Sequence, residues 1–168
     1  MNPFAWNFRT QFALGATLCA ALLAFALYVQ HGMFMMPCPL CILQRVAFAG
    51  MGVFFLLGAL IGPRPLWWRK LSALLVGVCA TIGAGIAGWH LRMQHLPASE
   101  VPSCSGMDLG YMLDAFPLQK VIDKVFTGSG ECAQIDWTFL GLSMPGWTLL
   151  WYVLLGVAAL WAGWRKRT

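Results

Sequence analysis

Long apolar runs set the pattern of this chain. Four of them are long enough to cross the hydrocarbon core of a membrane as helices, which takes about 20 residues each. These runs cover residues 12–29, 42–61, 71–89 and 147–164. The segments between them predict loops at residues 30–41 and 90–145, with the short turn GPRPLWWRK between the second and third runs. The pattern therefore predicts an all-α membrane protein, one integral domain over residues 1–168 built as a bundle of four transmembrane helices.

The long polar segment at residues 90–145 carries a second pattern. In the stretch PLQKVIDKVF, four apolar residues recur at helical spacing, and Pro117 suits a first helical turn. They are Leu118, Val121, Ile122 and Val125. The stretch is too short to span a bilayer, so we expect a short amphipathic helix lying on the membrane surface; packing against the protein is the alternative.

Composition and charge place this bundle in a lipid bilayer and orient it. The chain is 60% hydrophobic and only 10% charged, whereas a soluble domain has about 25% charged residues. All six acidic residues fall within residues 90–145, while cations cluster before the first run, in the short turn and at the C-terminus. By the positive-inside rule, both termini face the cytoplasm and the other two loops face the opposite side. The net charge of +5 then reflects topology, and we expect no nucleic-acid partner.

Six cysteines divide by position. Cys19 and Cys79 lie in the middle of the first and third runs, where a free cysteine usually acts as a small buried hydrophobe. The other four are expected on the non-cytoplasmic side, which is oxidising in bacteria. They are Cys38, Cys41, Cys104 and Cys132. Four cysteines allow three pairings, and proximity in sequence favours Cys38 with Cys41, which leaves Cys104 with Cys132.

The pair Cys38 and Cys41 suits redox chemistry better than a structural role. A static disulfide stabilises mainly by closing a long loop, and a C-x-x-C ring closes almost none. Short rings of this kind are typical of redox pairs, in which one thiolate has a lowered pKa. A zinc site usually takes four nitrogen or sulfur ligands, and the other two cysteines do not form a second C-x-x-C. Redox activity is therefore favoured, with static disulfides and a metal site as the alternatives.

Residues around this pair support the redox interpretation. Pro37 and Pro39 disfavour helix before Cys41, so we expect the second helix to begin near Cys41. A thiolate there is stabilised by the unpaired N–H groups and the positive end of the helix. Arg45 lies one turn deeper on the same face, where it can stabilise the Cys41 thiolate or an anionic ligand. The alternative for Arg45 is a side chain that extends to the lipid headgroups.

Two histidines, His31 and His90, lie at the non-cytoplasmic ends of apolar runs. We expect no haem, because no plausible axial pair lies deep in the bundle. His90 shares the side of Arg45, where it can hydrogen-bond a carbonyl of a bound ring. An interfacial histidine without such a role is an equal alternative.

Together these motifs resemble the DsbB family of membrane proteins. The shared features are four spans, CPLC opening the second span with an arginine four residues after its second cysteine, and a long loop with a separated cysteine pair. The stretch GSGECAQIDWTFLGLSMPGW is also similar to the family's segment from the second loop cysteine into the fourth span. The resemblance covers nearly the whole chain and implies a four-helix bundle with a long periplasmic loop that carries the short surface helix.

The resemblance implies a thiol:quinone oxidoreductase of the bacterial inner membrane, with both termini cytoplasmic and the catalytic loops periplasmic. A reduced DsbA-like partner would attack the Cys104–Cys132 disulfide and form a mixed disulfide with Cys104. Cys132 would then exchange with Cys38. Cys41 would pass the electrons to a membrane quinone, either ubiquinone or menaquinone.

The cofactor-binding residues implied in the same way are Arg45 and His90. Arg45 matches the family's quinone-site arginine, and His90 matches a quinone-proximal histidine by its place after the third span. No metal or haem cofactor is implied. Two other functions stay open: a four-helix quinone or vitamin-K-type reductase, whose C-x-x-C pair is expected near the last span, and a non-enzymatic membrane protein stapled by two disulfides.

Overall fold

Four long helices make up most of the described part of the molecule. The computed structural model describes residues 7–33, 37–61, 65–96, 130–133 and 138–165. The long helices are α1 (Phe8–Gly32), α2 (Pro39–Ile61), α3 (Leu66–Gln94) and α7 (Met144–Trp164). Each is long and apolar enough to cross a membrane, so the predicted all-α bundle with four spans is confirmed. The surface helix predicted in PLQKVIDKVF lies outside the described residues.

The helices extend past the apolar runs that predict them. All four predicted spans lie inside helices, but α3 begins at Leu66 and ends at Gln94. The segment WWRK is therefore helical rather than part of a turn, and the loop predicted at 90–145 begins later than expected. Pro65 takes the extended conformation of an N-cap residue, and no proline or other strong breaker follows it within α3. Hydropathy marks where the bilayer ends, whereas a helix continues until its backbone is interrupted.

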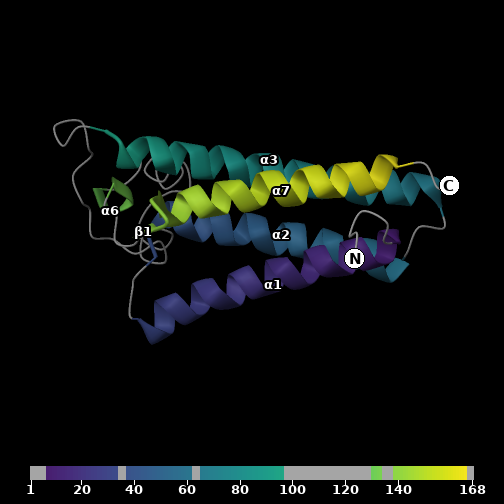
Figure 1. Ribbon diagram of the computed structural model, residues 1–168, viewed down its shortest axis with the longest axis horizontal. Helices are drawn as coiled ribbons and strands as arrows, with labels where there is room; N and C mark the ends of the chain where they lie inside the picture. Colours follow the sequence, from purple (N-terminus) through teal and green to yellow (C-terminus); the bar gives the residue numbers. More distant parts are fainter. Residues whose placement is uncertain (1–6, 34–36, 62–64, 97–129, 134–137, 166–168) are drawn as a thin grey trace, which may run out of the picture.

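The helices follow sequence order around the bundle (Figure 1). α1 packs mainly on α2, α2 on α3, and α3 on α7, whereas α1 and α7 contact each other much less. Figure 1 shows α1 leaning away from the other three helices toward the end at which α2 begins. The short elements α6 (Gly130–Ala133), β1 (Thr138–Phe139) and β2 (Leu142–Ser143) lie at that same end. We call it the sulfur end, because Cys38 and Cys132 lie there.

A tight hairpin leads into α7 at the sulfur end. β1 and β2 pair antiparallel, with Thr138 opposite Ser143 and Phe139 opposite Leu142. The turn between them has positive φ at Leu140 (52°) and at Gly141 (78°). Positive φ at both central residues matches the twist of a two-residue hairpin, and glycine adopts it without strain. The hairpin sets the point at which α7 starts.

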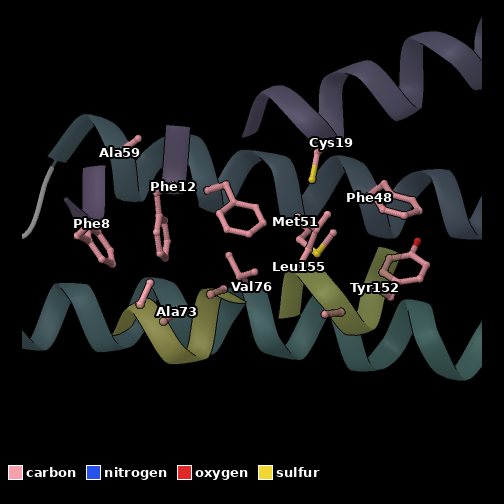
Figure 2. Packing of buried hydrophobic residues seen from close by; sticks show 14 of the residues in the cluster. Phe8, Phe12, Cys19, Phe48, Met51, Ala59, Ala73, Val76, Tyr152 and Leu155 are labelled. Atoms are coloured by element: carbon pink, nitrogen blue, oxygen red, sulfur yellow. The ribbon is translucent and has the colours of Figure 1, made fainter. Parts of the chain in front are cut away.

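Aromatic rings packed against glycines hold the bundle together. Figure 2 shows the buried side chains filling the space between the helices. The Phe12 ring of α1 lies over Gly58 of α2, where an added Cβ would come within 2.5 Å of it. Conversely, the Phe55 ring of α2 lies over Gly15 of α1, at 2.6 Å from such an atom. Small residues that let neighbouring helices approach are typical of membrane bundles. Cys19 is fully buried in this core, as predicted for a small hydrophobe.

Two arginines close the end opposite the sulfur end. Arg9 of α1 donates to the carbonyls of Ala59 and Leu60, where α2 finishes (3.0 and 3.3 Å). Arg69 of α3 donates to Gly163 (3.0 Å) and to the carbonyl of the residue after α7, Arg165 (2.8 Å). The last carbonyls of a helix have no partner within the helix, and a cation there also balances the helix dipole. Arg9 therefore caps the C-terminal end of α2, and Arg69 caps the C-terminal end of α7.

Candidate thiol and cavity site

Cys38 lies directly before α2 and caps its first turn. Its carbonyl accepts a hydrogen bond from the amide of Ile42 (3.2 Å), and its Sγ accepts one from the amide of Cys41 (3.4 Å). Those are the contacts of an N-cap residue, and Pro39 occupies the first helical position, where its missing N–H costs nothing. The helix therefore begins two residues earlier than expected. The prediction that Cys38 stays outside it is confirmed.

The N-cap arrangement brings the first two sulfurs together. The Sγ atoms of Cys38 and Cys41 lie 3.0 Å apart, and both residues are free thiols. A residue at the N-cap and one three positions on lie on the same side of the first helical turn, so C-x-x-C spacing places the second sulfur beside the first. The pair is thus poised to form or break a disulfide with little change in the backbone.

Cys132 joins this pair from the far end of the sequence. It lies on α6, is fully buried, and packs in one cluster with Cys38 and Leu40. The potential ligand atoms of Cys38, His90 and Cys132 all lie within 4.8 Å of one another. Since α6 packs on α3, the fold delivers a residue distant in sequence to the start of α2. Cys104, the remaining predicted relay cysteine, lies outside the described residues.

The sulfur cluster changes the acidity of Cys38. A hydrogen bond with Cys132 lowers the pKa of Cys38, but contact with Cys41 together with burial outweighs it and raises the pKa to about 12. A thiol loses its proton only near its pKa, so Cys38 is protonated at neutral pH in the dithiol form. It would therefore act less readily as an attacking thiolate than as a sulfur that is attacked once oxidised.

His90 lies against the sulfurs within a buried polar network. It belongs to α3, is only 3% exposed, and its Nε2 lies 3.8 Å from the Sγ of Cys38. Its Nδ1 lies 3.2 Å from the Nε2 of Gln44 in α2. The hydroxyl of Thr148 in α7 donates to Oε1 of Gln44 (2.8 Å), and the hydroxyl of Tyr152 donates to the Gln44 carbonyl (2.6 Å). Gln44 thus joins three helices around His90.

Arg45 binds α1 across the bundle. Its guanidinium donates to the Gln30 side-chain oxygen and to the carbonyl of Ala26 (3.1 Å). These bonds fix the cation at the edge of the site and hold α1 where it leans away. Gln30, Gln44 and Thr148 were not singled out from the sequence. The available signal was a polar side chain inside an otherwise apolar run, which identifies a candidate without naming its partner.

A cavity of about 500 Å³ lies beside the sulfurs and is lined by all four long helices and β1. Its walls are mostly apolar side chains of α1 and α7. Seven polar or thiol side chains also line it: Cys38, Cys41, Gln44, Arg45, His90, Gln94 and Thr148. A largely apolar pocket of this size with a few converging polar groups is typical of a small-molecule site. The structure therefore brings Cys41, Arg45 and His90 to one cavity.

Comparison with known proteins relates nearly the whole chain to one protein family. A family profile described as Disulfide bond formation protein DsbB matches residues 8–162. A protein of Xanthomonas axonopodis pv. citri is 49% identical over 167 residues, covering 99% of this chain and 96% of its own. One of Nitrosococcus oceani is 51% identical over 153 residues (91% and 89%), and one of Xylella fastidiosa is 41% identical over 165 residues (98% and 95%). All three are named Disulfide bond formation protein B.

Proposed function

Because the chain belongs to the DsbB family of disulfide-forming membrane proteins, we propose that it reoxidises a DsbA-like dithiol oxidase and passes the electrons to a membrane quinone. One observation carries the proposal. Three thiols, those of Cys38, Cys41 and Cys132, converge beside an apolar cavity that also contains a cation and a histidine. Static disulfides alone do not call for such a cavity.

The partner side of the relay depends on Cys104 and Cys132. A thiolate of the reduced partner attacks their disulfide at Cys104 and releases the Cys132 thiolate. That thiolate then attacks the Cys38–Cys41 disulfide at Cys38, which forms a Cys38–Cys132 disulfide and releases the Cys41 thiolate. The second partner thiolate attacks the partner's own sulfur in the mixed disulfide, which oxidises the partner and releases the Cys104 thiolate. The Cys104 thiolate then attacks at Cys132, which restores the Cys104–Cys132 disulfide and releases the Cys38 thiolate. The proximity of Cys132 to Cys38 supports this order, since exchange requires direct approach of one sulfur to another.

The acceptor side depends on Cys41 and the cavity. A bound quinone would accept the two electrons and two protons released when the thiols of Cys38 and Cys41 form their disulfide again. Cys38, Cys41, Arg45 and His90 line the cavity, so a ring held there would lie near two sulfurs and two hydrogen-bond donors. A DsbA-type partner has a reduction potential of about −120 mV. Each 30 mV by which the reduction potential of the acceptor exceeds it corresponds to about 1.4 kcal/mol for a two-electron transfer. An acceptor well above the partner therefore drives the relay forward.

The orientation in the membrane is part of the proposal. We place the sulfur end on the periplasmic side of the bacterial inner membrane and the arginine-capped end on the cytoplasmic side. Arg9 and Arg69 lie at the capped end, which agrees with an excess of cations on the cytoplasmic side. The opposite end then meets the oxidising compartment in which a DsbA-like partner works.

The test is turnover by the purified full-length protein in detergent, with a soluble ubiquinone analogue and a reduced DsbA-type partner. We expect quinone-dependent oxidation of the partner's thiols. Cys41→Ser should abolish it, and Cys79→Ala, which changes a cysteine that does not line the cavity, should not. Equal turnover in Cys41→Ser would contradict the proposal. Net reduction of the partner by a quinol would favour the reductase alternative, and no turnover at all would favour a stapled membrane protein.

A further inference from the structure

The sulfur cluster has the composition of a metal site. Cys38, Cys41, Cys132 and His90 together offer three sulfurs and one imidazole, a Cys₃His set that is common in structural zinc sites. Sequence spacing did not predict it, because no second C-x-x-C is present. The fold supplies the other two ligands from α3 and α6.

Three of the four donor atoms lie close together, and the fourth lies beside one of them. Cys38, His90 and Cys132 place theirs within 4.8 Å of one another, and the Cys41 sulfur lies 3.0 Å from that of Cys38. In a tetrahedral zinc site the ligand atoms are separated by about 3.4–3.8 Å, given bond lengths of about 2.0–2.3 Å. Binding would therefore draw the donor atoms of Cys38, His90 and Cys132 closer together and separate the two sulfurs of Cys38 and Cys41. Three of the four residues, Cys38, His90 and Cys132, are also buried.

The polar network around His90 provides the support that a metal-bound imidazole requires. A ligand histidine usually donates its other N–H to a fixed acceptor. If Nε2 binds the ion, Nδ1–H faces the Gln44 amide at 3.2 Å, and that amide can present its oxygen. Its nitrogen then donates to the Thr148 hydroxyl, which donates in turn to the Pro145 carbonyl (2.9 Å). In this arrangement His90, Gln44 and Thr148 each keep a hydrogen-bond partner.

We propose that the reduced protein binds one Zn²⁺ through Cys38, Cys41, Cys132 and His90, and that this ion holds the protein in its dithiol state. Formation of the Cys38–Cys41 disulfide removes two of the four ligands, so binding is lost on oxidation. Bound thiolates are also unavailable for exchange, so the ion blocks turnover until it is removed. The proposal goes beyond the electron relay, because binding requires neither partner nor quinone.

The experiment is a Zn²⁺ titration of the full-length protein in detergent against a chromophoric chelator. We expect one Zn²⁺ per chain in the reduced protein and binding at least about 100-fold weaker after oxidation of the thiols. Co²⁺ should give the absorption bands of a tetrahedral sulfur-rich site. Adding Zn²⁺ during turnover should stop it, and a chelator should restore it.

Variants separate a built site from nonspecific thiol binding. Cys132→Ser and His90→Ala should each weaken Zn²⁺ binding about 100-fold, while His90→Cys restores it as a four-sulfur site with a shifted Co²⁺ spectrum. Gln44→Leu leaves all four ligands in place but removes the side-chain amide that supports His90, so it should weaken Zn²⁺ binding about 10-fold. Cys79→Ala is the control and should bind as the parent does. The proposal would be overturned if the oxidised protein bound Zn²⁺ as tightly as the reduced protein does. It would also be overturned if Cys132→Ser and His90→Ala both bound Zn²⁺ as tightly as the parent. Either result would mean an adventitious ion only.

Discussion

At the scale of single residues, Gln44 organises the site. It is 4% exposed, and its side chain and backbone contact His90, Thr148 and Tyr152. A buried amide is costly unless its groups are hydrogen-bonded, and here the side-chain nitrogen, the side-chain oxygen and the backbone carbonyl each have a partner. The cysteines and Arg45 could be predicted from sequence because their chemistry and spacing are rare in an apolar chain. Gln44 could not, since its role depends on two helices that are far away in sequence.

The acidity of Cys38 gives a prediction at this scale. Its pKa is raised from the ordinary 9.0 to about 12, so near pH 8 its thiolate fraction should be about a thousandfold smaller than that of an ordinary cysteine. Cys41→Ser removes one cause of the rise and should speed alkylation of Cys38 by iodoacetamide. Cys132→Ser removes a contact that lowers the pKa and should slow it.

Peptide-resolved mass spectrometry of the reduced protein, over about pH 8 to 11, measures these rates. The unfolded protein gives the reference rate for each cysteine. A shift of the same sign in both variants, or a Cys38 that reacts as fast as in the unfolded chain, would show that the assigned causes are wrong.

At the scale of elements, hydropathy predicts the existence of the four helices but not their ends or their contacts. The runs mark the bilayer-embedded parts, yet α3 continues through WWRK and past His90. Placing His90 on a helix rather than in a loop gives it a fixed direction toward Cys38. The contacts between helices depend on which glycine meets which ring, as where Tyr152 of α7 lies against Gly83 of α3.

This contact predicts different outcomes for two glycines of one helix. A methyl group at Gly83 would overlap the Tyr152 ring, whereas one at Gly85 would meet nothing within 4 Å. We expect Gly83→Ala to destabilise the protein by about 1–3 kcal/mol, because the ring must move out of a packed core. Gly85→Ala should be neutral or slightly stabilising, since alanine favours helix.

Unfolding of both variants in mixed detergent, followed by circular dichroism, makes the comparison. Because Tyr152 also holds Gln44, Gly83→Ala should lower turnover in the same preparation. Equal stability of the two variants would mean that Tyr152 does not depend on the space above Gly83.

At the scale of the whole molecule, the cavity is the feature that no single element contains. All four long helices contribute to it, and α1 lines one wall with Ala26 and Val29. The sequence indicates how many helices there are, but the angle of α1 follows from packing at one end and the Arg45 bonds at the other. Because residues of α1 form part of the cavity wall, the sequence predicts Cys41, Arg45 and His90 as site residues but does not predict the cavity that they share.

A substitution that fills the cavity tests its use. Ala26→Phe adds a ring on the cavity wall, whereas Ala24→Phe adds the same ring on an exposed face of α1. We expect Ala26→Phe to raise KM for the quinone analogue about 10-fold or more, because the added volume excludes part of the ligand. Thiol exchange with the partner in a single turnover should be unchanged.

Steady-state kinetics at varied quinone concentration gives KM, and quenched-flow trapping of the mixed disulfide gives the exchange rate. Ala24→Phe should match the parent in both. An unaltered KM in Ala26→Phe would place the acceptor outside this cavity.

The hydrogen bonds from Arg9 to the end of α2 fix the N-terminal end of α1. Near that cap, α1 is held by the interlocked pairs Phe12 with Gly58 and Phe55 with Gly15. The helix has 25 residues and is about 37 Å long, so a rotation of about 3° at the cap displaces its far end by about 2 Å. The Arg45 bonds restrain that far end. Because the cavity lies beside that far end, its width depends on the Arg45 bonds as well as on the packing of the core.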